Sequence, residues 1–543
     1  MNFISTQTPY SKTGFFSKMV LDYLGQVKPL QPFYTHPVSV EGIKAAIEDR
    51  KKYPTGRELL VEELKKQYQH VVATEKTTQH IGLLLSGNTF TITTAHQPNI
   101  FTGHLYFIYK VVHAIKLAEF LKAEIPGCDF VPVFYMGSED ADLEELGHVY
   151  INGVKHEWKT EQTGAVGRMK VDKALTSMLD AIAGELNVQP FGKDITGLMK
   201  DCYPEGATIE QATFKLVNEL FGEYGLVVLL PDNAALKKAF IPVIEKELTE
   251  AFSHKLVEHT VAAFPAEYKV QAGGRAINLF YLKEDSRQRI EKTGAQWSIV
   301  NGKQQFSEPE IRKEFNEHPD RFSPNVILRP VFQEMILPNI AFIGGGGEIA
   351  YWLELKKVFE VVKVPFPPLV LRNSFMLAEE KQGKLAGNLG LSLMDLFKTE
   401  NDLLNDIVKR NSSVQLSLQK ERKAMDTFYT NLKNTAGAVD PTLQRHTQAL
   451  HKKALDKLEA LEKKMLRAEK KKFEAQQRQL HKLKEQLFPH GSLQERIENF
   501  MPFYAKWGRG FIDAVHKHSL ALEQEFVVME ENDFFRIGDT PAC

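Results

Sequence analysis

Residues 90–110, FTITTAHQPNIFTGHLYFIYK, contain the polar side chains whose types and spacing best suit catalysis. The β-branched run from Phe90 to Thr94 predicts a strand, and Pro98 ends it before apolar residues recur at helical spacing from Leu105. Ligands of open α/β sheets bind beyond the carboxyl ends of the strands, and the start of a helix favours anions. The residues expected to face a ligand are His96, Gln97, Asn99, Thr102, Gly103 and His104.

His96 is the strongest catalytic candidate in this stretch. An imidazole at a strand end can donate to negative charge developing on a carboxylate or phosphoryl group, and can act as a general acid near neutral pH. The alternative is a histidine that only fastens the loop through backbone hydrogen bonds. The sequence leaves both interpretations open.

A second group of polar residues follows the apolar run DFVPVFYMG, residues 129–137. Four carboxylates crowd this predicted strand end, and His148 follows Glu144 at helical spacing. They are Glu139, Asp140, Asp142 and Glu144. Acidic residues are common in a first helical turn, where the helix dipole stabilises them. The alternative is a site for Mg²⁺ or for a substrate amine, which carboxylate oxygens at a strand terminus would suit.

Four consecutive glycines, Gly344 to Gly347, join a predicted strand to a helix that begins at about Glu348. Bare backbone N–H groups at such a junction can cradle a phosphate, although the run matches neither the Walker pattern nor GxGxxG. Arg329 and Arg372 lie at predicted strand ends, where they could clamp a carboxylate or form a salt bridge.

The elements that must position these residues are those of an α/β fold. GLVVLLP, residues 225–231, is typical of a buried parallel strand, with Asp232 as the cap of the next helix. Three more strands are expected in NVILRPVFQEMILP, IAFIGGGG and PFPPLVLRNS, which begin at residues 325, 340 and 365. Asn301-Gly302 indicates a hairpin in a small β-containing insertion between residues 265 and 322.

From about residue 395 the composition changes to Lys, Glu, Gln, Leu and Ala, with apolar residues seven apart. Gly437 and Pro441 interrupt this pattern, which predicts a coiled-coil hairpin with arms of ~60 to 70 Å that project from the core. We expect the seam to form a homodimer, the alternative being pairing of the two arms alone. The lysine-rich second arm, 441–488, leaves an RNA or acidic partner as a lesser alternative to a solvated helix face.

The end of the chain contains Ser492-x-x-Glu495, which predicts a capping box for a final helical region. The tail EFVVMEENDFFRI, residues 525–537, is expected to return to the core. The predicted segments are a first part of the core, a core unit with connective insertions, a second part of the core, a coiled-coil hairpin and a C-terminal segment. Their bounds are 1–150, 151–324, 325–390, 391–488 and 489–543.

Composition excludes several classes of protein. The 543 residues suggest three to four domains by size, and 43% hydrophobic with 25% charged residues is typical of a globular protein. A net charge of −1 gives no global attraction to nucleic acid or to a membrane surface. Three distant cysteines and no apolar run of about eighteen residues predict a cytoplasmic protein without disulfides, zinc or a membrane span.

Four stretches together carry a resemblance to a known family, and the likeness covers nearly the whole chain. They are HQPNIFTGHLYFIYK, PVFYMGSEDADLEELGHVY, LRPVFQEMILPNIAFIGGGGEIAYWLELKKVF and LFPHGSLQERIENF. The chain resembles the bacillithiol-biosynthesis cysteine-adding enzymes. The resemblance implies an α/β, Rossmann-like core related to class I nucleotidyltransferases, with connective insertions and a dimerising coiled coil.

The resemblance also implies a reaction, in which the carboxyl group of cysteine is joined to the amine of glucosaminyl-malate with ATP or another adenine nucleotide. Mg²⁺ remains an option because of the carboxylates that follow residue 137. Two features depart from related patterns. The family often has proline where this chain has His104, and Phe101 stands where an HxGH signature would begin, with no KMSKS-like loop elsewhere. A scaffold without catalysis, or a synthetase-like RNA-binding protein, is therefore the alternative.

The expected roles fall into three groups. The catalytic residues are His96, Gln97, Thr102 and Asp140. The substrate-binding residues are Asn99, Gly103, Tyr106, Lys110, Glu139, Asp142, His148, Arg329, Gln333, Glu334 and Arg372. The nucleotide-binding residues are Gly344, Gly345, Gly346, Gly347, Glu348 and Tyr351. The sequence assigns no metal ligands.

Overall fold

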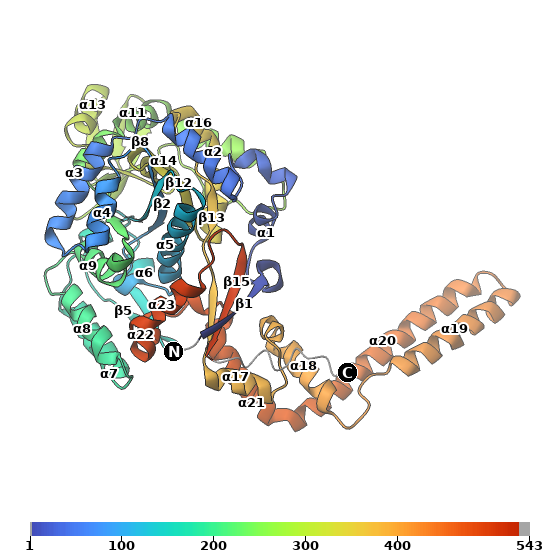
Figure 1. Ribbon diagram of the computed structural model, residues 1–543. Coiled ribbons are helices and arrows are strands. Elements are labelled where there is room, and N and C mark those ends of the chain that lie inside the picture. The colour runs from blue at the N-terminus through green and yellow to red at the C-terminus, as the bar shows by residue number, and fades with distance from the viewer. Residues whose placement is uncertain (1–2, 532–543) are drawn as a thin grey trace. The chain divides into compact units, whose positions relative to one another are not determined.

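A computed structural model describes residues 3–531 of the chain. The chain divides into two compact units, of which the first consists mainly of Ser5–Met376 and Ser492–Met529, and the second mainly of Leu377–Gly491 (Figure 1). Strand β15 (Glu525–Glu531) accounts for the first half of the predicted tail, and residues 532–537 of that tail lie outside the described residues. β15 lies between β1 (Phe3–Pro9) and β14 (Phe375–Ala378) in a three-stranded sheet.

The centre of the first unit is a five-stranded sheet in which every neighbouring pair is parallel. Its strands are buried almost throughout, because helices cover parallel sheets on both faces and the strands are then apolar nearly without interruption. In spatial order they are β13 (Leu369–Leu371), β12 (Asn339–Gly344), β2 (Thr89–His96), β3 (Asp129–Met136) and β6 (Val227–Leu229). The predicted α/β, Rossmann-like core is confirmed.

Helix α5 (Tyr106–Glu124) follows β2 and packs on β2 and β3. Together with α2 (Val40–Lys51) and the central strands it forms a buried apolar cluster. Its larger members are Ile43, Ile47, Phe90, Ile92, Leu117, Leu121, Ile340 and Ile343. The parallel register pairs His96 with Met136, so the polar residues after β2 and after β3 begin at the same edge of the sheet.

Other helices and short strands surround this sheet in the first unit. The N-terminal part adds α1 (Lys18–Leu24), α3 (Arg57–Gln67) and α4 (Glu75–Leu83). Between β3 and β6 lie α6 (Leu143–Leu146), β4 (His148–Ile151), β5 (Val154–Glu157), α7 (Lys173–Leu186), α8 (Gly192–Cys202) and α9 (Ile209–Phe221). After β6 come α10 (Ala234–Lys238), α11 (Ile241–Glu250) and α12 (Phe252–Ala262). After β12 come α15 (Gly346–Leu353) and α16 (Lys356–Val362), and the unit ends with α22 (Met501–Trp507), α23 (Arg509–His518) and most of β15.

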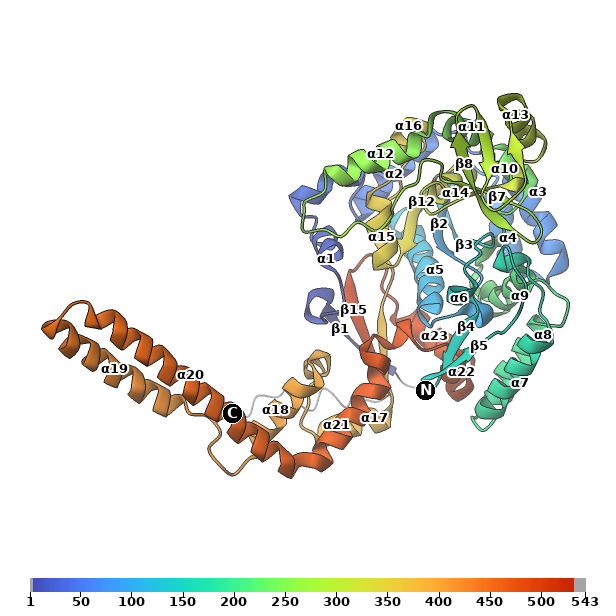
Figure 2. The same cartoon turned by 180° about the vertical axis from the view of Figure 1, so that it is seen from behind.

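The predicted β-containing insertion is an antiparallel sheet with the order β10-β9-β8-β7-β11 (Figure 2). Asn301 has a φ of 62° in the turn between β9 and β10, which confirms the hairpin predicted from Asn301-Gly302. The strands are β7 (Leu279–Leu282), β8 (Arg287–Thr293), β9 (Gln296–Ile299), β10 (Gln305–Phe306) and β11 (Phe322–Pro324), with α13 (Glu308–Glu317) before β11.

Two local predictions in the core are wrong. The segment NVILRPVFQEMILP is not a strand, because residues 329–336 form helix α14 (Arg329–Ile336). Its buried apolar residues Leu328, Val331, Phe332 and Ile336 recur three to four apart, which is helical spacing, and Pro330 lies in the first turn, where proline is tolerated. The cap of α10 is Asn233, whose side chain accepts the Leu236 N–H, and not Asp232.

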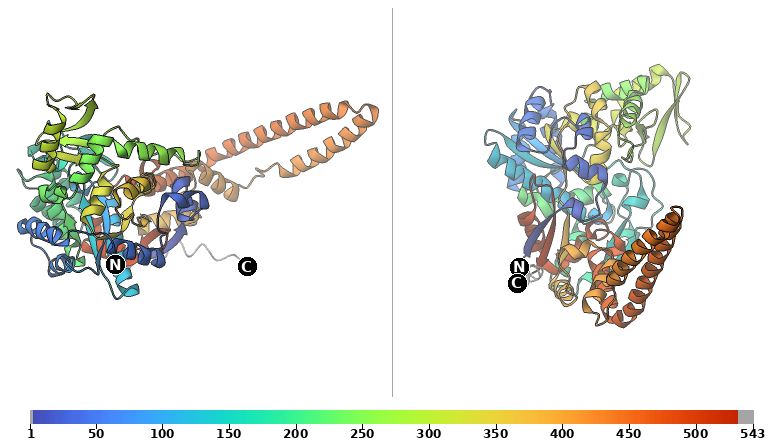
Figure 3. Two further views of the ribbon diagram at one scale, coloured as in Figure 1. Left: turned by 90° about the horizontal axis from the view of Figure 1, so that it is seen from above. Right: turned by 90° about the vertical axis from the view of Figure 1, so that its right-hand side faces the viewer.

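The second unit is helical, and its predicted coiled-coil hairpin is confirmed. Helices α19 (Gln419–Val439) and α20 (Leu443–Lys470) pack against each other along their length and are the orange pair in Figure 3. The His451 ring stacks on Tyr429 and its Nε2 lies 2.8 Å from an Asp426 carboxylate oxygen. The other helices are α17 (Glu380–Asn388), α18 (Glu400–Asn411) and α21 (Glu474–Leu487). Within residues 3–531 no helix is both long and apolar enough to cross a membrane.

The first arm of the hairpin is not the single helix that the heptad pattern predicted. Helix α18 ends at Asn411, and α19 begins at Gln419. The Ser412 hydroxyl accepts the Val414 N–H at 3.2 Å and donates to a carboxylate oxygen of Glu469. A serine side chain that bonds nearby backbone competes with the helical pattern, which explains the break.

A buried ion pair joins α2 to α14. Arg50 donates to a carboxylate oxygen of Glu334 at 2.6 Å and to the Asn339 carbonyl at 2.8 Å. Glu334 also accepts from the side-chain amides of Asn339 and Gln333, and both side chains of the ion pair are at most 1% exposed. Gln333 and Glu334 were predicted to bind substrate, but the structure places them in this interior network because α14 is a helix.

This pair predicts a large loss of stability on substitution of Glu334. Glu334→Gln removes the charge that balances buried Arg50, so the free energy of unfolding should fall by about 3–5 kcal/mol in urea denaturation. Glu48→Gln, which removes the partner of Lys51 in an exposed pair, is the matched control and should change it by less than ~0.5 kcal/mol. Equal losses in the two variants would contradict the assignment of Glu334 to the core.

Candidate active site

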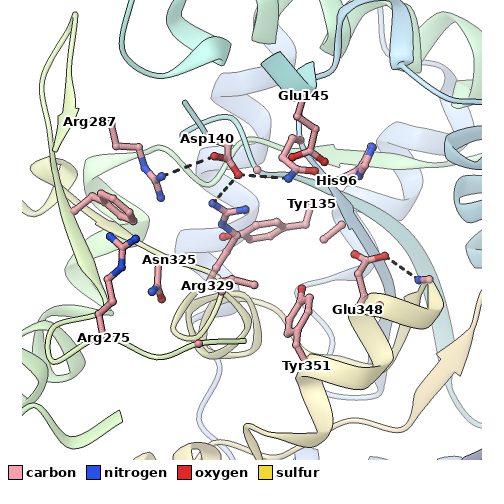
Figure 4. A pocket seen from close by; sticks show the side chains of 18 of the residues that line it. His96, Tyr135, Asp140, Glu145, Arg275, Arg287, Asn325, Arg329, Glu348 and Tyr351 are labelled. Atoms are coloured by element: carbon pink, nitrogen blue, oxygen red, sulfur yellow. Dashed lines mark hydrogen bonds and ion pairs between the residues drawn. The ribbon is translucent and has the colours of Figure 1, made fainter. Parts of the chain in front are cut away.

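A cavity of about 520 Å³ opens at the carboxyl ends of β2, β3 and β12, within the first unit (Figure 4). The central sheet supplies the residues after those strands, and the antiparallel sheet supplies residues from β7, β8 and the turns beside them. Of the predicted site residues, the cavity is lined by His96, Gln97, Tyr106, Asp140, Arg329, Gly345, Gly346, Gly347, Glu348, Tyr351 and Arg372. Segments more than two hundred residues apart in sequence therefore meet in one pocket.

The lining is rich in charge, with arginines outnumbering carboxylates. The arginines are Arg275, Arg287, Arg289, Arg329, Arg372 and Arg496, and the carboxylates are Asp140, Glu145 and Glu348. Guanidinium groups hold carboxylates and phosphates in a planar, bidentate geometry. The pocket is therefore suited to an anionic ligand.

Asp140 is held between two of these arginines. Its carboxylate lies 3.6 Å from Arg329 and 3.8 Å from Arg287, and it accepts from the Gln97 side chain at 3.3 Å (Figure 4). Burial alone would raise the pKa of Asp140, but Arg329 first, then Arg287 and the hydrogen bonds from Gln97 and the Ala141 N–H, outweigh it and lower the pKa. Asp140 is therefore ionised at neutral pH, and it links β3 to the antiparallel sheet.

Two contacts hold the Arg287 side chain in position. It donates to the Ser323 hydroxyl at 3.0 Å and lies 3.9 Å from the centre of the Phe280 ring. Burial, together with the neighbouring charge of Arg329, lowers the pKa of Arg287 to about 10, which still leaves it a cation at neutral pH. Arg287 and Arg289 are two apart on β8, so they extend from the same face of the strand.

The three carboxylates of the pocket differ in their partners. Glu348 accepts from Lys110 at 2.7 Å and from the Gly345 N–H at 2.8 Å. Asp140 has its arginines, whereas the Glu145 carboxylate has neither an ion pair nor a hydrogen bond within residues 3–531. Burial, with Asp140 and Asp142 adding to it, raises the pKa of Glu145. Glu145 is thus the lining carboxylate that remains available to a ligand.

The glycine run is less open to phosphate than its sequence suggests. Gly345, Gly346 and Gly347 line the cavity, but Gly344 is in strand β12 and does not. The Glu348 carboxylate occupies the Gly345 N–H and brings a negative charge to the start of α15. Lys110, which was predicted to bind substrate, is buried and neutralises that carboxylate. The positive charge that the pocket offers to an anionic ligand therefore comes mainly from its arginines.

His96 lies at the edge of the cavity, against the aromatic start of α5. Its ring centre is 5.4 Å from that of Tyr106, whose hydroxyl lies 3.5 Å from His96 Nε2. Burial lowers the pKa of His96 well below its usual value, and the charges of Lys110, His104 and Arg372 lower it further. This shift favours the neutral imidazole, so we expect the ring to serve as a hydrogen-bonding group rather than as a general acid near neutral pH.

The acidic stretch after β3 does not gather at one point. Glu139 is buried in an ion pair with Lys237, which also binds Asp232 at 3.2 Å. Asp142 caps α6 by accepting the Glu145 N–H, as the helix-cap interpretation expected. No group of three or more potential metal ligands occurs within residues 3–531. The carboxylates of this stretch therefore have separate partners and are not gathered around one point.

Several other predicted residues lie outside the cavity lining. Thr102 and Asn99 are buried in the loop before α5, and Gly103 belongs to the same turn. His148 begins strand β4, so it is not on a helix with Glu144, although its Nδ1 lies 2.8 Å from the Glu144 carbonyl. The helix α6 is too short to include it, because Gly147 follows its last residue.

The predicted capping box at Ser492 and Glu495 is wrong, because Glu495 has a different role. Residues 494–496 form a single 3₁₀ turn, and the buried Glu495 carboxylate accepts from Arg372 at 2.7 Å and from the Phe375 N–H at 3.2 Å. Arg372 in turn lies 5.0 Å from the Tyr106 ring. The C-terminal segment thus orients one arginine of the pocket and contributes Arg496 directly.

Sequence reasoning missed seven lining residues that bear on the chemistry. They are Tyr135, Glu145, Arg275, Arg287, Arg289, Asn325 and Arg496. One signal was present in the sequence, because RQR at 287–289 places two arginines on one face of a predicted strand. Nothing in the sequence indicated that the antiparallel insertion would contact the carboxyl edge of the main sheet.

Two family matches cover nearly all of the described residues. Residues 2–373 match "Bacillithiol biosynthesis BshC, N-terminal Rossmann-like domain", and residues 375–531 match "Bacillithiol biosynthesis BshC, C-terminal coiled-coil domain". The chain belongs to the BshC family of bacillithiol biosynthesis. The matched boundary at residues 373–375 falls just before the division between the two units at residue 377.

Individual relatives support the same membership. A protein of Flavobacterium johnsoniae named "Putative cysteine ligase BshC" is 40% identical over 522 residues, covering 96% of this chain and 98% of the relative. A protein of Cytophaga hutchinsonii with the same name is 40% identical over 489 residues, covering 90% and 92%. A crystal structure described as a "putative arginyl t-RNA synthetase" of Campylobacter jejuni covers 86% of this chain and 98% of that chain at 9% identity. Its TM-score of 0.23 supports no inference.

The charge arrangement predicts how the pocket responds to loss of Asp140. Asp140→Asn removes the anion that lies between Arg287 and Arg329, so a sulfate ion should bind about tenfold more tightly, a gain of ~1.4 kcal/mol. Calorimetric titration with sulfate measures this. Asp142→Asn, outside the cavity, is the control and should leave sulfate affinity unchanged; similar affinities for the parent and Asp140→Asn would contradict the pairing.

Proposed function

We propose that this chain is a ligase that forms an amide between the carboxyl group of cysteine and the amine of glucosaminyl-malate, with ATP as the nucleotide. The observation that carries the proposal is the pocket itself, where several arginines and one available carboxylate meet at the carboxyl edge of a Rossmann-like sheet. A substrate that bears carboxylates and an amine matches this set of groups. The name of the relatives, "Putative cysteine ligase BshC", supports the same class of reaction.

The carboxylates of the malate group would bind to the arginines of the antiparallel sheet. Arg287 and Arg289 extend from one face of β8, and Arg275 comes from the segment before β7. Arg275 and Arg496 have no ion-pair partner within residues 3–531, so their charges are available without breaking an existing pair. A dicarboxylate would bring negative charge to a pocket that has an excess of positive charge.

The amine of glucosaminyl-malate would lie against Glu145. An amine attacks a carboxyl carbon only after it has lost its proton, so a nearby base is needed. Glu145 has a raised pKa and no competing partner, whereas Asp140 is held as an anion by two arginines. Glu145 would therefore hold the ammonium group and accept its proton, and Asp140 would orient Arg287, Arg329 and Gln97.

The pocket also has groups that fit a nucleotide. Gly346 and Gly347 at the start of α15, with Arg372 and Arg496, would hold the phosphates, while Glu348 limits how closely they approach the Gly345 N–H. When bound, ATP supplies the leaving group that an unactivated carboxylate lacks. His96 and Gln97 would hydrogen-bond the oxygens of the carboxyl group under attack, where a fixed neutral donor stabilises developing charge.

Two further features accompany the proposed activity. We place the reaction in the cytoplasm, where thiols remain reduced, consistent with the free and buried Cys128 and Cys202. We also propose that the hairpin of α19 and α20 forms a homodimer. No residue of α19 is buried, and Phe428 and Leu461 are 60% and 48% exposed, which leaves apolar surface on the hairpin for a second copy.

The activity is tested with purified protein, cysteine, glucosaminyl-malate and ATP, with bacillithiol detected by mass spectrometry. His96→Asn keeps a hydrogen-bond donor of similar reach, so stability should be nearly intact, but turnover should fall by about 10²-fold or more because the donor is displaced. His104→Asn is the control, since His104 lies outside the cavity lining and contacts the Ile497 carbonyl. It should cost less than about tenfold.

The pH profile gives a second readout of His96. Because its pKa is lowered well below the usual value, His96 should stay neutral from pH 8 down to pH 6. Protonation of His96 should therefore cause no fall in the turnover of the parent protein over this range. Absence of product from the parent would remove the proposed function. Unchanged turnover in His96→Asn would remove His96 from the chemistry.

The dimer proposal predicts a specific effect of charge on the hairpin. The double variant Phe428→Glu and Leu461→Glu places charges on exposed apolar positions, so it should sediment as a monomer in analytical ultracentrifugation. Thr427→Glu with Thr430→Glu adds the same charge at exposed polar positions and should remain a dimer. A parent that sediments as a monomer, or a double variant that stays dimeric, would contradict the assignment.

A further inference from the structure

The loop between β2 and α5 contains three consecutive residues with positive φ. The values are 53° at Phe101, 69° at Thr102 and 68° at Gly103. Glycine adopts such angles freely, but phenylalanine and β-branched threonine do so only when the surrounding structure enforces them. A Cβ atom on Gly103 would also lie 2.7 Å from the Asn99 Cβ. This turn, residues 101–103, is therefore held in place by contacts from outside the loop.

Asn499 supplies the most direct of these contacts. Its side-chain amide donates to the Phe101 carbonyl at 2.9 Å and to the Gly103 carbonyl at 2.5 Å, on either side of Thr102. Its oxygen accepts the Met501 N–H at 2.9 Å, and the side chain is fully buried. The amide nitrogen and the amide oxygen of Asn499 are thus both hydrogen-bonded. A hydrophobic side chain of the same size could not make these bonds.

Two neighbouring groups complete the support. The Tyr203 hydroxyl accepts the Phe101 N–H at 3.2 Å, and the Glu498 carbonyl accepts the Leu105 N–H at 2.6 Å. The hydroxyl of Thr102 is buried and has no hydrogen-bond partner within residues 3–531. The Thr102 side chain thus adds no hydrogen bond to the turn, although its N–H donates to the Asn99 carbonyl at 3.1 Å within the loop. The side chains that support the left-handed backbone from outside the loop are Asn499 and Tyr203.

The turn determines where α5 begins and hence where the reacting groups lie. Tyr106, the first residue of α5, lines the cavity, and its ring contacts His96. A turn that relaxed to ordinary angles would move the start of α5 and change the His96 to Tyr106 contact. Small displacements of positioned groups in an active site cost large factors in rate.

We propose that Asn499 is a positioning residue, which clamps the turn 101–103 and thereby places His96 and Tyr106 in the pocket. Its effect on rate rests on the proposed ligase function, but its effect on geometry does not. Nothing about residues 493–499 in the sequence indicates this role, because Asn499 lies almost four hundred residues after the loop that it holds.

The main variant is Asn499→Leu, which keeps the approximate volume and removes both donors. We expect kcat to fall at least tenfold while KM changes less than threefold. Asn218→Leu is the matched control. Asn218 lies on α9, is buried and donates to the Val72 carbonyl at 2.9 Å, and it does not line the cavity. This variant should lower the unfolding midpoint but leave kcat within twofold. Equal losses of kcat in the two variants would overturn the proposal.

Relief of the strained angle provides a rescue that a purely structural role would not show. Thr102→Gly allows the positive φ without external support. Adding it to Asn499→Leu should therefore restore kcat to within threefold of the Thr102→Gly single variant. If Asn499→Leu lowers kcat by the same factor in the parent and in the Thr102→Gly background, the clamp is not the cause and the proposal fails.

A measurement without turnover separates this inference from the proposed function. The carbon–proton NMR signals of the His96 ring, assigned by comparison with His96→Asn, should shift in Asn499→Leu, return in the double variant and remain unchanged in Asn218→Leu. If the parent forms no product but these shifts occur, the ligase proposal fails and the clamp stands. Unchanged signals in Asn499→Leu would refute the clamp. Should Asn499→Leu not fold, Tyr203→Phe removes the other support and is expected to shift the same signals.

Discussion

The Asp140 carboxylate joins the central sheet to the antiparallel sheet, and the charge of the pocket depends on it. Asp140 follows β3 in the central sheet, Arg287 belongs to β8 of the antiparallel sheet, and Arg329 begins α14. Two guanidinium groups close to one carboxylate leave an excess positive charge. That excess suits the pocket to an anionic ligand, and the contacts of Arg287 with Ser323 and Phe280 fix where the charge lies.

The other buried charges in this region are balanced before they reach the cavity. Arg50 is paired with Glu334, Lys237 with Glu139, Lys110 with Glu348, and Arg372 with Glu495. Breaking such a pair leaves an uncompensated buried charge, so substitution of any of these residues should destabilise the fold. The lining groups without an ion-pair partner within residues 3–531 are Glu145, Arg275 and Arg496. In the orientation that we propose, Glu145 holds the substrate amine, Arg275 helps to hold the malate carboxylates and Arg496 helps to hold the phosphates.

The sequence predicted the strands of the central sheet well because buried parallel strands are nearly continuous apolar runs, as in residues 225–231. It failed at residues 325–338, where a similar density of apolar residues forms a helix with spacing of three to four. Pockets are harder to predict than strands. His96, Asp140 and Arg329 could be chosen because they follow strands or apolar runs, and all three line the cavity.

Long-range contacts explain most of the remaining errors in the candidate site. Glu139 and Glu334 have the right residue types, but they are buried in ion pairs with Lys237 and Arg50, which lie far away in the sequence. Gln333 is buried beside Glu334 and donates to its carboxylate. Asn499 and Glu495 were not chosen, or were given a helix-cap role, because the groups that they hold are more than one hundred residues distant. No local pattern records such pairings.

The most direct test of this account is a crystal structure with glucosaminyl-malate bound. The account predicts the malate carboxylates on arginines from the group Arg275, Arg287, Arg289 and Arg329, and the sugar amine within hydrogen-bonding distance of Glu145. A ligand bound outside this cavity, or bound within it with its amine directed away from Glu145, would contradict the proposed orientation and the role of the available carboxylate.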